Sequence, residues 1–256
     1  MIELNDVTFA WPEEIPILNK LTFAVKPEEK IVVLGANGCG KSTLLKLLNG
    51  LIEPTEGSIY WQGDRLTRQY LKGHSRYFRQ NCVLLFQHPE AMLFNPTVRE
   101  ELSYGPRQLG LTDIDTRIAY WSEQLQLTAL LDKAPFLLSG GQKQKVALAC
   151  LLMLDPSLLL LDEPSASLDP ATVGWLIDTL AHSKKTLIIA THNLSLAAEL
   201  GERCIVLGAN GAILFDGLIQ SALADLPLLE QAGLAHRHLH YHGGAGHKHI
   251  HIHDWQ

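Results

Sequence analysis

The sequence predicts an α/β fold with a mainly parallel sheet and helices on both of its faces. Three observations predict this class. Apolar strand-like segments alternate with helical segments along most of the chain. One apolar strand runs directly through a glycine-rich segment into a helix, and a helical block at residues 97–154 interrupts the alternation, so we expect it to form a lobe of its own.

The expected elements follow from local patterns. Buried or alternating apolar runs indicate strands, and apolar residues at helical spacing between stop signals indicate helices. We expect strands at residues 21–25, 30–35, 59–61, 82–86, 157–162, 186–191, 204–207 and 212–215, and helices at 41–49, within 97–132, at 138–154, after Pro170 and at 194–200. The chain divides into a body at 1–225, with its helical lobe at about 88–154, and a linker with a histidine-rich tail at 226–256.

Composition excludes some classes of protein. The 256 residues are 46% hydrophobic, enough for a substantial core, and the net charge of −6 argues against nucleic acid as a partner. The longest apolar run, residues 146–154, is too short to span a bilayer, and residues 1–11 alternate like a strand rather than forming a signal peptide. Four scattered cysteines indicate reduced thiols. We therefore expect a soluble, cytosolic chain that would need a partner for any role at a membrane.

The segment "GANGCGKS", Gly35 to Ser42, fits the phosphate-binding pattern G-x-x-x-x-G-K-[ST] and stands between a predicted strand and a predicted helix. Glycines allow backbone N–H groups to turn toward phosphate oxygens, and the helix N-terminus adds partial positive charge. Lys41 is expected to reach the β- and γ-phosphates, and the Ser42 hydroxyl to ligate Mg²⁺. The alternative is an ordinary glycine-rich turn.

The segment "LLLLDEP", residues 158–164, supplies the carboxylates that such a site needs at the end of a neighbouring buried strand. Asp162 is placed to hold Mg²⁺, and Glu163 to orient an attacking water. By itself, an acidic pair after an apolar strand is often only a capped strand end. Together with the glycine-rich loop, it predicts a nucleoside-triphosphate hydrolase.

The segment "LSGGQKQKVALA", residues 138–149, lies just upstream of the acidic strand. Ser139 and Gln142 have the spacing of a helix capping box, so the segment could be a well-capped helix and nothing more. However, "SGG" also leaves N–H groups at a helix start that could bind an anion. The segment resembles the signature motif of ATP-binding cassette (ABC) proteins. That resemblance covers residues 1 to about 225 and implies a P-loop core with an antiparallel β subdomain and a helical signature lobe.

In the family, the signature motif closes over ATP held by a second subunit, so the resemblance implies a dimer. It also implies roles at matching positions. Gln87 would sense Mg²⁺ and water, Asp169 would cross the dimer interface, His192 would contact the γ-phosphate, and Trp11 would stack on adenine, although an aromatic in an early strand is often core. The implied catalytic residues are Glu163, His192 and Gln87, and Mg²⁺ would be held by Ser42, Gln87 and Asp162. The implied ATP-binding residues are Trp11, Gly35, Asn37, Gly38, Gly40, Lys41, Ser42, Thr43, Ser139, Gly140, Gly141, Gln142 and Asp169.

Two positions depart from the family pattern. Cys39 lies in the phosphate loop where serine is common, and beside a helix N-terminus we expect a lowered pKa for its thiol, with ATP protecting it from alkylation. Lys145 replaces an arginine that often follows the signature motif, and we expect it to supply the same charge less rigidly.

The segment "FQHPEAMLFNPTVREELSYGP", residues 86–106, resembles the ATPases of energy-coupling factor importers, which bring vitamins or transition-metal ions into prokaryotic cells. The resemblance implies a transmembrane scaffold subunit, a substrate-capture membrane subunit and a peripheral location at the cytoplasmic face of the membrane. We expect the docking groove within residues 87–104. Its apolar residues could instead belong to the core of the lobe, as Met92, Leu93, Phe94 and Val98 illustrate.

The tail carries histidines at alternate positions in two sets around "GGAG", which suggests a hairpin bridged by metal. Neutral imidazole suits nickel, cobalt, zinc and copper. A purification tag and an inert low-complexity extension are the alternatives. The candidate ligands are His236, His238, His240, His242, His247, His249, His251 and His253.

The sequence thus predicts the ATP-hydrolysing subunit of an energy-coupling factor importer for cobalt or nickel. ATP and Mg²⁺ are the expected cofactors, with Ni²⁺ or Co²⁺ on the tail. The expected partners are the two membrane subunits and a second, identical ATPase chain that completes a homodimer, and no nucleic acid is expected. The alternatives are the ATPase of a vitamin importer of the same type, a soluble cassette ATPase acting on nucleic acid or ribosomes, and a metal-storage or chaperone protein with secondary ATP binding.

Overall fold

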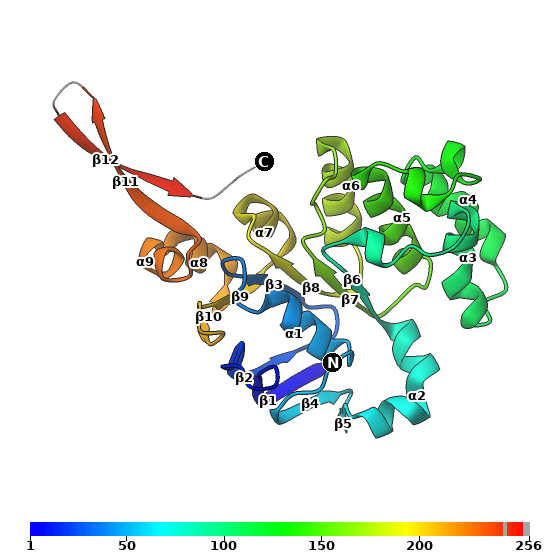
Figure 1. The fold of residues 1–256 in the computed structure, drawn as a ribbon, viewed down its shortest axis with the longest axis horizontal. Coiled ribbons are helices and arrows are strands. Elements are labelled where there is room, and N and C mark those ends of the chain that lie inside the picture. The colour runs from blue at the N-terminus through cyan, green and yellow to red at the C-terminus, as the bar shows by residue number, and fades with distance from the viewer. Residues whose placement is uncertain (243–244, 253–256) are drawn as a thin grey trace.

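The computed structural model describes residues 1–242 and 245–252, and beyond Ala235 it describes the backbone alone. Its centre is a six-stranded sheet in the order β10-β9-β3-β8-β7-β6 (Figure 1). Every neighbouring pair is parallel except β9 and β10. The strands are β3 (Lys30–Leu34), β6 (Cys82–Leu85), β7 (Leu158–Asp162), β8 (Thr186–Thr191), β9 (Arg203–Leu207) and β10 (Ile213–Leu218). The predicted α/β class is confirmed.

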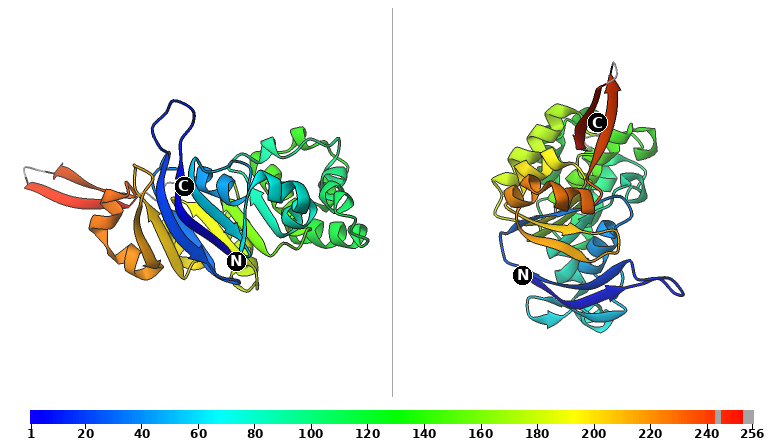
Figure 2. Two further views of the ribbon diagram at one scale, coloured as in Figure 1. Left: turned by 90° about the horizontal axis from the view of Figure 1, so that it is seen from below. Right: turned by 90° about the vertical axis from the view of Figure 1, so that its left-hand side faces the viewer.

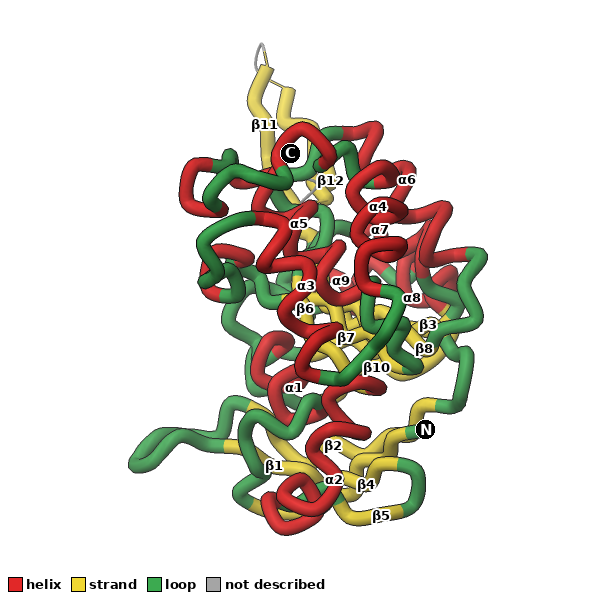
Figure 3. The backbone as a smooth tube through the Cα atoms, turned by 90° about the vertical axis from the view of Figure 1, so that its right-hand side faces the viewer, coloured by secondary structure: helices red, strands yellow, loops and turns green. Residues whose placement is uncertain are grey.

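A second, antiparallel sheet has the order β2-β1-β4-β5 and lies with α2 at one end of the molecule (Figure 3). Its strands are β1 (Ile2–Phe9), β2 (Leu18–Val25), β4 (Glu56–Trp61) and β5 (Asp64–Arg65). The inward face of β1 is buried and much of its other face is exposed, as a half-covered antiparallel sheet requires. The loop between β1 and β2 projects from the body (Figure 2).

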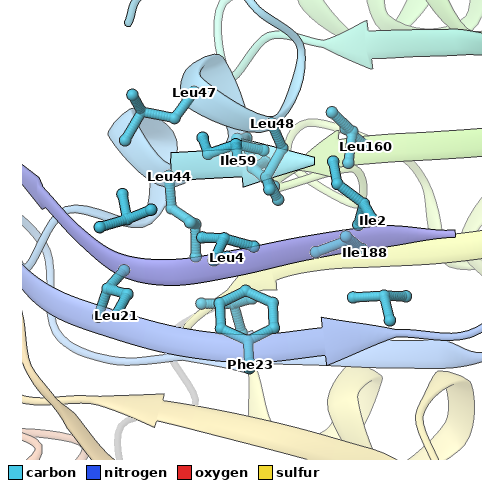
Figure 4. Close-up of a cluster of buried hydrophobic side chains, with 14 of the residues drawn as sticks. Ile2, Leu4, Leu21, Phe23, Leu44, Leu47, Leu48, Ile59, Leu160 and Ile188 are labelled. Atoms are coloured by element: carbon cyan, nitrogen blue, oxygen red, sulfur yellow. The ribbon is translucent and has the colours of Figure 1, made fainter. Parts of the chain in front are cut away.

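The first helix, α1 (Lys41–Leu48), is packed between the two sheets. Leu44, Leu47 and Leu48 of this helix contact the inward side chains of β1 and β4, and Leu160 and Ile188 of the central sheet lie in the same cluster (Figure 4). Each fully buried side chain of this kind stabilises the fold by roughly 1.5–3 kcal/mol. This packing fixes the direction in which the N-terminus of α1 points, and the phosphate loop lies there.

The helical lobe consists of α3 (Val98–Gln108), α4 (Ile114–Gln124) and α5 (Gly140–Leu152). Thr97 and Ser139 cap α3 and α5 with their hydroxyl groups. The apolar side of α5 packs against β6 and β7 through Val146, Ala147 and Ala149, which belong to the same core as α6 (Pro170–Ala181) and α7 (Leu194–Leu200). The predicted helical lobe is therefore present and joined to the central sheet.

Three helices lie outside the sequence-based expectation: α2 (Arg68–Asn81), α8 (Ile219–Ala224) and α9 (Leu226–Gln231). Helix α2 buries only Phe78 and has non-helical dihedral angles at His74, and its sequence is too polar to stand out as a core helix. Helix α9 begins where the linker was expected. Leu228 and Leu229 of α9 are buried against Val32 and Leu34 of β3, so the folded body continues to Ala235.

The histidine-rich segment forms an antiparallel hairpin of β11 (Ala235–His242) and β12 (Ala245–Ile252), which projects from the end of the molecule opposite the helical lobe (Figure 1). The expected hairpin is present in the backbone. No helix in the part of the chain that the structure describes is long and apolar enough to cross a bilayer.

Candidate nucleotide-binding site

The phosphate loop runs from the end of β3 to the start of α1. Gly38 and Gly40 have φ angles of 84° and 103°, in the region where a side chain is strained. At Gly40 a Cβ atom would also lie 2.6 Å from Leu18 Cδ2. Gly40 is the N-cap of α1 and offers no side-chain cap, so the first-turn N–H groups are not occupied by a capping side chain. This helix start suits a phosphate group.

Lys41 is the first residue of α1 and is only 7% exposed. Its Nζ atom donates to the carbonyl oxygen atoms of Gly35 (2.7 Å) and Ala36 (3.1 Å). These bonds satisfy a buried ammonium group with neutral acceptors. The positive charge therefore stays inside the loop, where it can attract an anion.

The acidic pair lies at the end of β7 and lines the same pocket as Lys41 and Ser42. Asp162 and Glu163 are 4% and 7% exposed. Burial raises the pKa of Asp162, and the charge of Glu163 raises it further, whereas a hydrogen bond from Ser42 and the charge of Lys41 act in the opposite direction. A cation bound beside Asp162 would favour its ionised form.

Glu163 is held by the end of β8. Thr191 Oγ1 donates to Glu163 Oε2 (2.8 Å), and the His192 backbone N–H donates to Oε1 (3.1 Å). His192 Nδ1 lies 2.6 Å from Oε1. Glu163 itself has a φ of 46°, a strained conformation for a residue with a side chain. The structure thus brings Glu163 and His192 into direct contact.

One pocket of about 410 Å³ collects most of the predicted residues. Its lining comprises Ile17, Asn37, Gly38, Gly40, Lys41, Ser42, Thr43, Gln87, Asp162 and Glu163. Ile17 was missed by the sequence analysis, because nothing in the pattern separates it from the other apolar residues near β2. Trp11 is not part of the lining. It is 43% exposed on the β1–β2 loop and packs edge-on against Phe9, with ring centroids 4.9 Å apart, so adenine stacking by Trp11 stays a prediction.

Three side chains with oxygen atoms that could bind Mg²⁺ line this pocket. Ser42, Gln87 and Asp162 all line it, and Ser42 hydrogen-bonds to Asp162. Hydroxyl, amide and carboxylate oxygen atoms are the ligands that Mg²⁺ takes, usually together with water and substrate phosphates. These residues therefore fit the ion. When bound, Mg²⁺ would neutralise charge on the phosphates.

The signature segment lies at the N-terminus of α5. Ser139 and Gln142 make a complete capping box: the Ser139 hydroxyl accepts from the Gln142 N–H (3.3 Å), and the Gln142 side chain accepts from the Ser139 N–H (3.0 Å). Gly141 packs on backbone, because a Cβ atom there would lie 2.5 Å from the Ser167 carbonyl oxygen. None of the four signature residues 139–142 lines the phosphate pocket.

Asp169 is the N-cap of α6, near the signature segment. Hydrogen bonds from Thr172 and then from Lys145 lower its pKa, and Lys145 Nζ lies 3.0 Å from the Asp169 carboxylate. Lys145, which departs from the family pattern, therefore has a defined partner in this chain.

The expectation of a lowered pKa for the Cys39 thiol is wrong. The side chain is 3% exposed, and burial raises the pKa of its thiol, which outweighs the opposing effect of the Lys41 charge. A helix N-terminus lowers the pKa of a nearby thiol, but Cys39 is also packed closely against Gly35, where a Cβ atom would lie 2.5 Å from Cys39 Sγ. Cys39 is a packing residue that is poorly placed to react with an alkylating agent.

The predicted tail ligands are described only in part. His236, His238, His240 and His242 lie on β11 and His247, His249 and His251 on β12, with the backbone alone described, and His253 lies outside the described residues. Among the side chains that the structure describes, no group of three or more His, Cys, Asp or Glu residues could hold a metal ion.

Comparison with known proteins identifies the class that this fold and pocket define. The family model of the ABC transporter matches residues 18–166. A putative ABC transporter ATP-binding protein of Methanosarcina acetivorans is 41% identical over 93% of this chain and 90% of its own length. The chain belongs to the ATP-binding proteins of ABC transporters, which are ATPases coupled to transport.

Similarity to two further proteins assigns the chain to the energy-coupling factor type within this family. The energy-coupling factor transporter ATP-binding protein EcfA of Methanothermobacter thermautotrophicus is 35% identical over 91% of this chain and 76% of its own length. The structure of cbiO1 from Clostridium perfringens, part of the ABC transporter complex cbiONQ, superposes with a TM-score of 0.74 at 26% identity, covering 91% and 94% of the two chains. The chain is the ATPase subunit of an importer of this type.

Proposed function

We propose that this ATPase powers the uptake of cobalt or nickel ions. We assign ATP hydrolysis to the pocket that Lys41, Asp162 and Glu163 line together. The choice of substrate rests on one observation, the alternating histidines of the tail, because imidazole is a ligand that these two ions share. The histidines would bind the transported metal as a buffer or sensor and would take no part in hydrolysis.

Each residue of the pocket has a proposed role in hydrolysis. The phosphate loop, from Gly35 to Thr43, cradles the phosphates, and Lys41 leaves its carbonyl acceptors for the β- and γ-phosphates. Glu163 orients and polarises the attacking water while His192, already in contact with it, turns to the γ-phosphate. Gln87 places a polar side chain at the same pocket and links it to the segment that follows.

We propose that the signature helix acts on a second copy of the chain. Its N-terminus lies outside the pocket that contains Lys41, so a phosphate that it binds must belong to another site. In a dimer, the α5 N-terminus of each copy, with Ser139, would contact the nucleotide that is bound in the phosphate pocket of the other copy. Asp169, beside the signature segment, lies at the proposed interface.

The docking of the membrane scaffold is proposed at residues 87–104. Val98 is fully buried and belongs to the core of the lobe, and Met92 and Leu93 pack against that core. Phe94 is 66% exposed and packs edge-on against Tyr104, with ring centroids 4.9 Å apart. Phe94 and Tyr104 thus form the exposed apolar part of the segment, and we assign the contact with the membrane subunit to them. The chain would then lie at the cytoplasmic face of the membrane, and the second membrane subunit would capture the metal.

The test is uptake of radiolabelled nickel and cobalt by cells that carry the importer with one of four chains. These chains are the wild type, Glu163→Gln, Glu199→Gln as a control on an exposed carboxylate, and a chain that ends at Ala235, which keeps the buried Leu234 and Ala235. We expect Glu163→Gln alone to abolish uptake of one of the metals. Uptake of both metals that is independent of Glu163 would contradict the proposal and would favour a vitamin as the substrate.

A further inference from the structure

The hairpin register places histidines opposite one another. His236 pairs with His251, His238 with His249 and His240 with His247. These pairs occur at every second position of both strands, so they share one face of the two-stranded ladder. Arg237, Leu239 and their partners occupy the other face. The topology thus collects six imidazole-bearing residues on one face, and the register adds to the predicted hairpin which histidines stand opposite one another.

The hairpin is attached directly to the folded core. Strand β11 begins at Ala235, which is 4% exposed, and Leu234 before it is 1% exposed. Both belong to a cluster that includes Val32 and Leu34 of β3, the strand that leads into the phosphate loop. No flexible linker therefore separates the histidines from the body.

The same joint contacts the phosphate loop itself. The Ala36 N–H donates to the carbonyl oxygen of Ala232 (3.2 Å), three residues before β11 begins. Gly233 has a φ of 69°, and a Cβ atom there would lie 3.1 Å from Ala36 Cβ, so this close approach depends on glycine. The base of the hairpin therefore holds one side of the Ala36 peptide.

Lys41 contacts the carbonyl group of the same residue, Ala36. Its Nζ atom donates to the Ala36 carbonyl oxygen, and the proposed binding of phosphate requires Lys41 to leave that oxygen. Ala36 is thus the residue at which the anchor of the hairpin and the phosphate-binding lysine meet. A change in the order or position of the hairpin base has a direct route to the nucleotide.

We infer that a divalent transition-metal ion bound across the paired histidines is sensed by the phosphate loop through Ala232, Gly233 and Ala36, and that it tightens ATP binding. The inference rests on the proposed binding of metal by the tail. A metal that bridges the two strands orders the hairpin and its base, so less conformational entropy is lost when the loop closes on phosphate. Loaded metal would then favour the ATP-bound chain, and by linkage ATP would strengthen metal binding equally.

The experiment measures the dissociation constant of a fluorescent ATP analogue in excess Mg²⁺, with and without Ni²⁺, and the binding of Ni²⁺ to the same samples by calorimetry. Four full-length chains are compared. They are the wild type, a chain in which the six paired histidines are replaced by glutamine, Gly233→Ala, and Gly63→Ala as a matched control. Gly63 also has a positive φ, of 92°, but a Cβ atom there would meet nothing within 4 Å.

We expect Ni²⁺ to tighten nucleotide binding at least about fivefold in the wild type and in Gly63→Ala. The six-histidine variant should lose both the Ni²⁺ binding and the tightening, whereas Gly233→Ala should keep the Ni²⁺ binding and lose the tightening. In the wild type, a non-hydrolysable ATP analogue should tighten Ni²⁺ binding by the same factor, which tests the coupling without any substitution.

Three results would overturn the inference in distinguishable ways. Normal Ni²⁺ binding with an unchanged nucleotide affinity in the wild type would remove the coupling and leave the proposed metal binding intact. Ni²⁺ binding that is absent, or that does not depend on the six histidines, would remove both. Tightening in Gly233→Ala equal to that of the wild type would refute the route through Ala36.

Discussion

Among the described helices, α1 and α5 each have an N-terminus to which we assign an anion, and the two N-termini differ in how they are capped. At α1, Gly40 supplies no side-chain cap, and the buried ammonium group of Lys41 stands beside the first turn. At α5, Ser139 and Gln142 form a capping box that satisfies two N–H groups, those of Ser139 and Gln142 themselves, from within the chain. Helix α1 thus leaves its N-terminus open to a phosphate, whereas α5 is capped by its own side chains, and we propose that the ligand at its N-terminus is brought by another molecule.

The carboxyl groups near the two helices, Asp162 near α1 and Asp169 near α5, have pKa values shifted in opposite directions. Burial raises the pKa of Asp162 beside α1, whereas hydrogen bonds lower the pKa of Asp169 near α5. At Asp162 the hydrogen bond from Ser42 does not offset burial, whereas at Asp169 the hydrogen bonds from Thr172 and Lys145 do. The α1 end is therefore built around groups that a nucleotide and a cation would satisfy.

The largest effect is expected from Lys41→Ala at α1. The variant removes the ammonium group that we propose moves from the carbonyl oxygen atoms of Gly35 and Ala36 to the phosphates, where a hydrogen bond to a charged group contributes about 1.5–3 kcal/mol. The affinity for ATP should therefore fall at least about tenfold in a fluorescence titration. Lys46→Ala, on the same helix, is the control and should bind ATP like the wild type. Equal affinities for all three chains would show that α1 is not the phosphate site.

At α5, Ser139→Ala should cost stability and hydrolysis but little ATP affinity. Loss of an N-cap costs about 1 kcal/mol, which lowers the melting temperature by roughly 2–4 °C in a chain of this size. Thr97→Ala removes the corresponding cap of α3 and should lower the melting temperature similarly. Only Ser139→Ala should also reduce the rate of ATP hydrolysis, by about fivefold or more. A similar loss of rate in both variants would reduce Ser139 to a capping residue.

Asp162→Asn tests the difference between the two carboxylates. A carboxyl group whose pKa is raised in the folded state binds its proton more tightly there than in the unfolded chain, so it disfavours folding as pH rises through the raised pKa. The neutral amide should therefore raise the melting temperature at pH 7 without Mg²⁺ by about 2 °C, and should abolish the stabilisation that Mg²⁺-ATP gives the wild type. A lower melting temperature without Mg²⁺ would contradict the burial argument.

The smallest effect is expected at Cys39. Since its thiol is buried and its pKa is raised, maleimide should label it much more slowly at pH 7 than a free thiol, with or without ATP. Cys39→Ser should leave the rate of hydrolysis within about twofold. Rapid labelling of Cys39 that ATP prevents would restore the reactive thiol that the sequence suggested.

The sequence was sufficient for the phosphate loop and the acidic strand because their chemistry depends on short, local spacing. Lys41, Asp162 and Glu163 lie in one pocket as expected. It was insufficient where a residue's role depends on distant neighbours. The burial of Cys39 comes from packing within the folded loop, and the contact of Ala232 with Ala36 joins segments almost 200 positions apart, which no local pattern encodes. Helix α2 was missed because its polar sequence buries a single side chain.

The most direct test of the account is the ATP-dependent association of chains that cannot complete hydrolysis. Sedimentation velocity would compare Glu163→Gln with the double variant Glu163→Gln, Gly141→Ala. The added methyl group would lie 2.5 Å from the Ser167 carbonyl oxygen and displace the α5 N-terminus, whereas at Gly73 of helix α2 it would meet nothing within 4 Å, which makes Glu163→Gln, Gly73→Ala the control. We predict dimers with Mg²⁺-ATP for Glu163→Gln and for the control, and monomers that still bind ATP for the Gly141→Ala chain. Dimers of equal stability in all three chains would contradict the claim that α5 serves the nucleotide of a second copy.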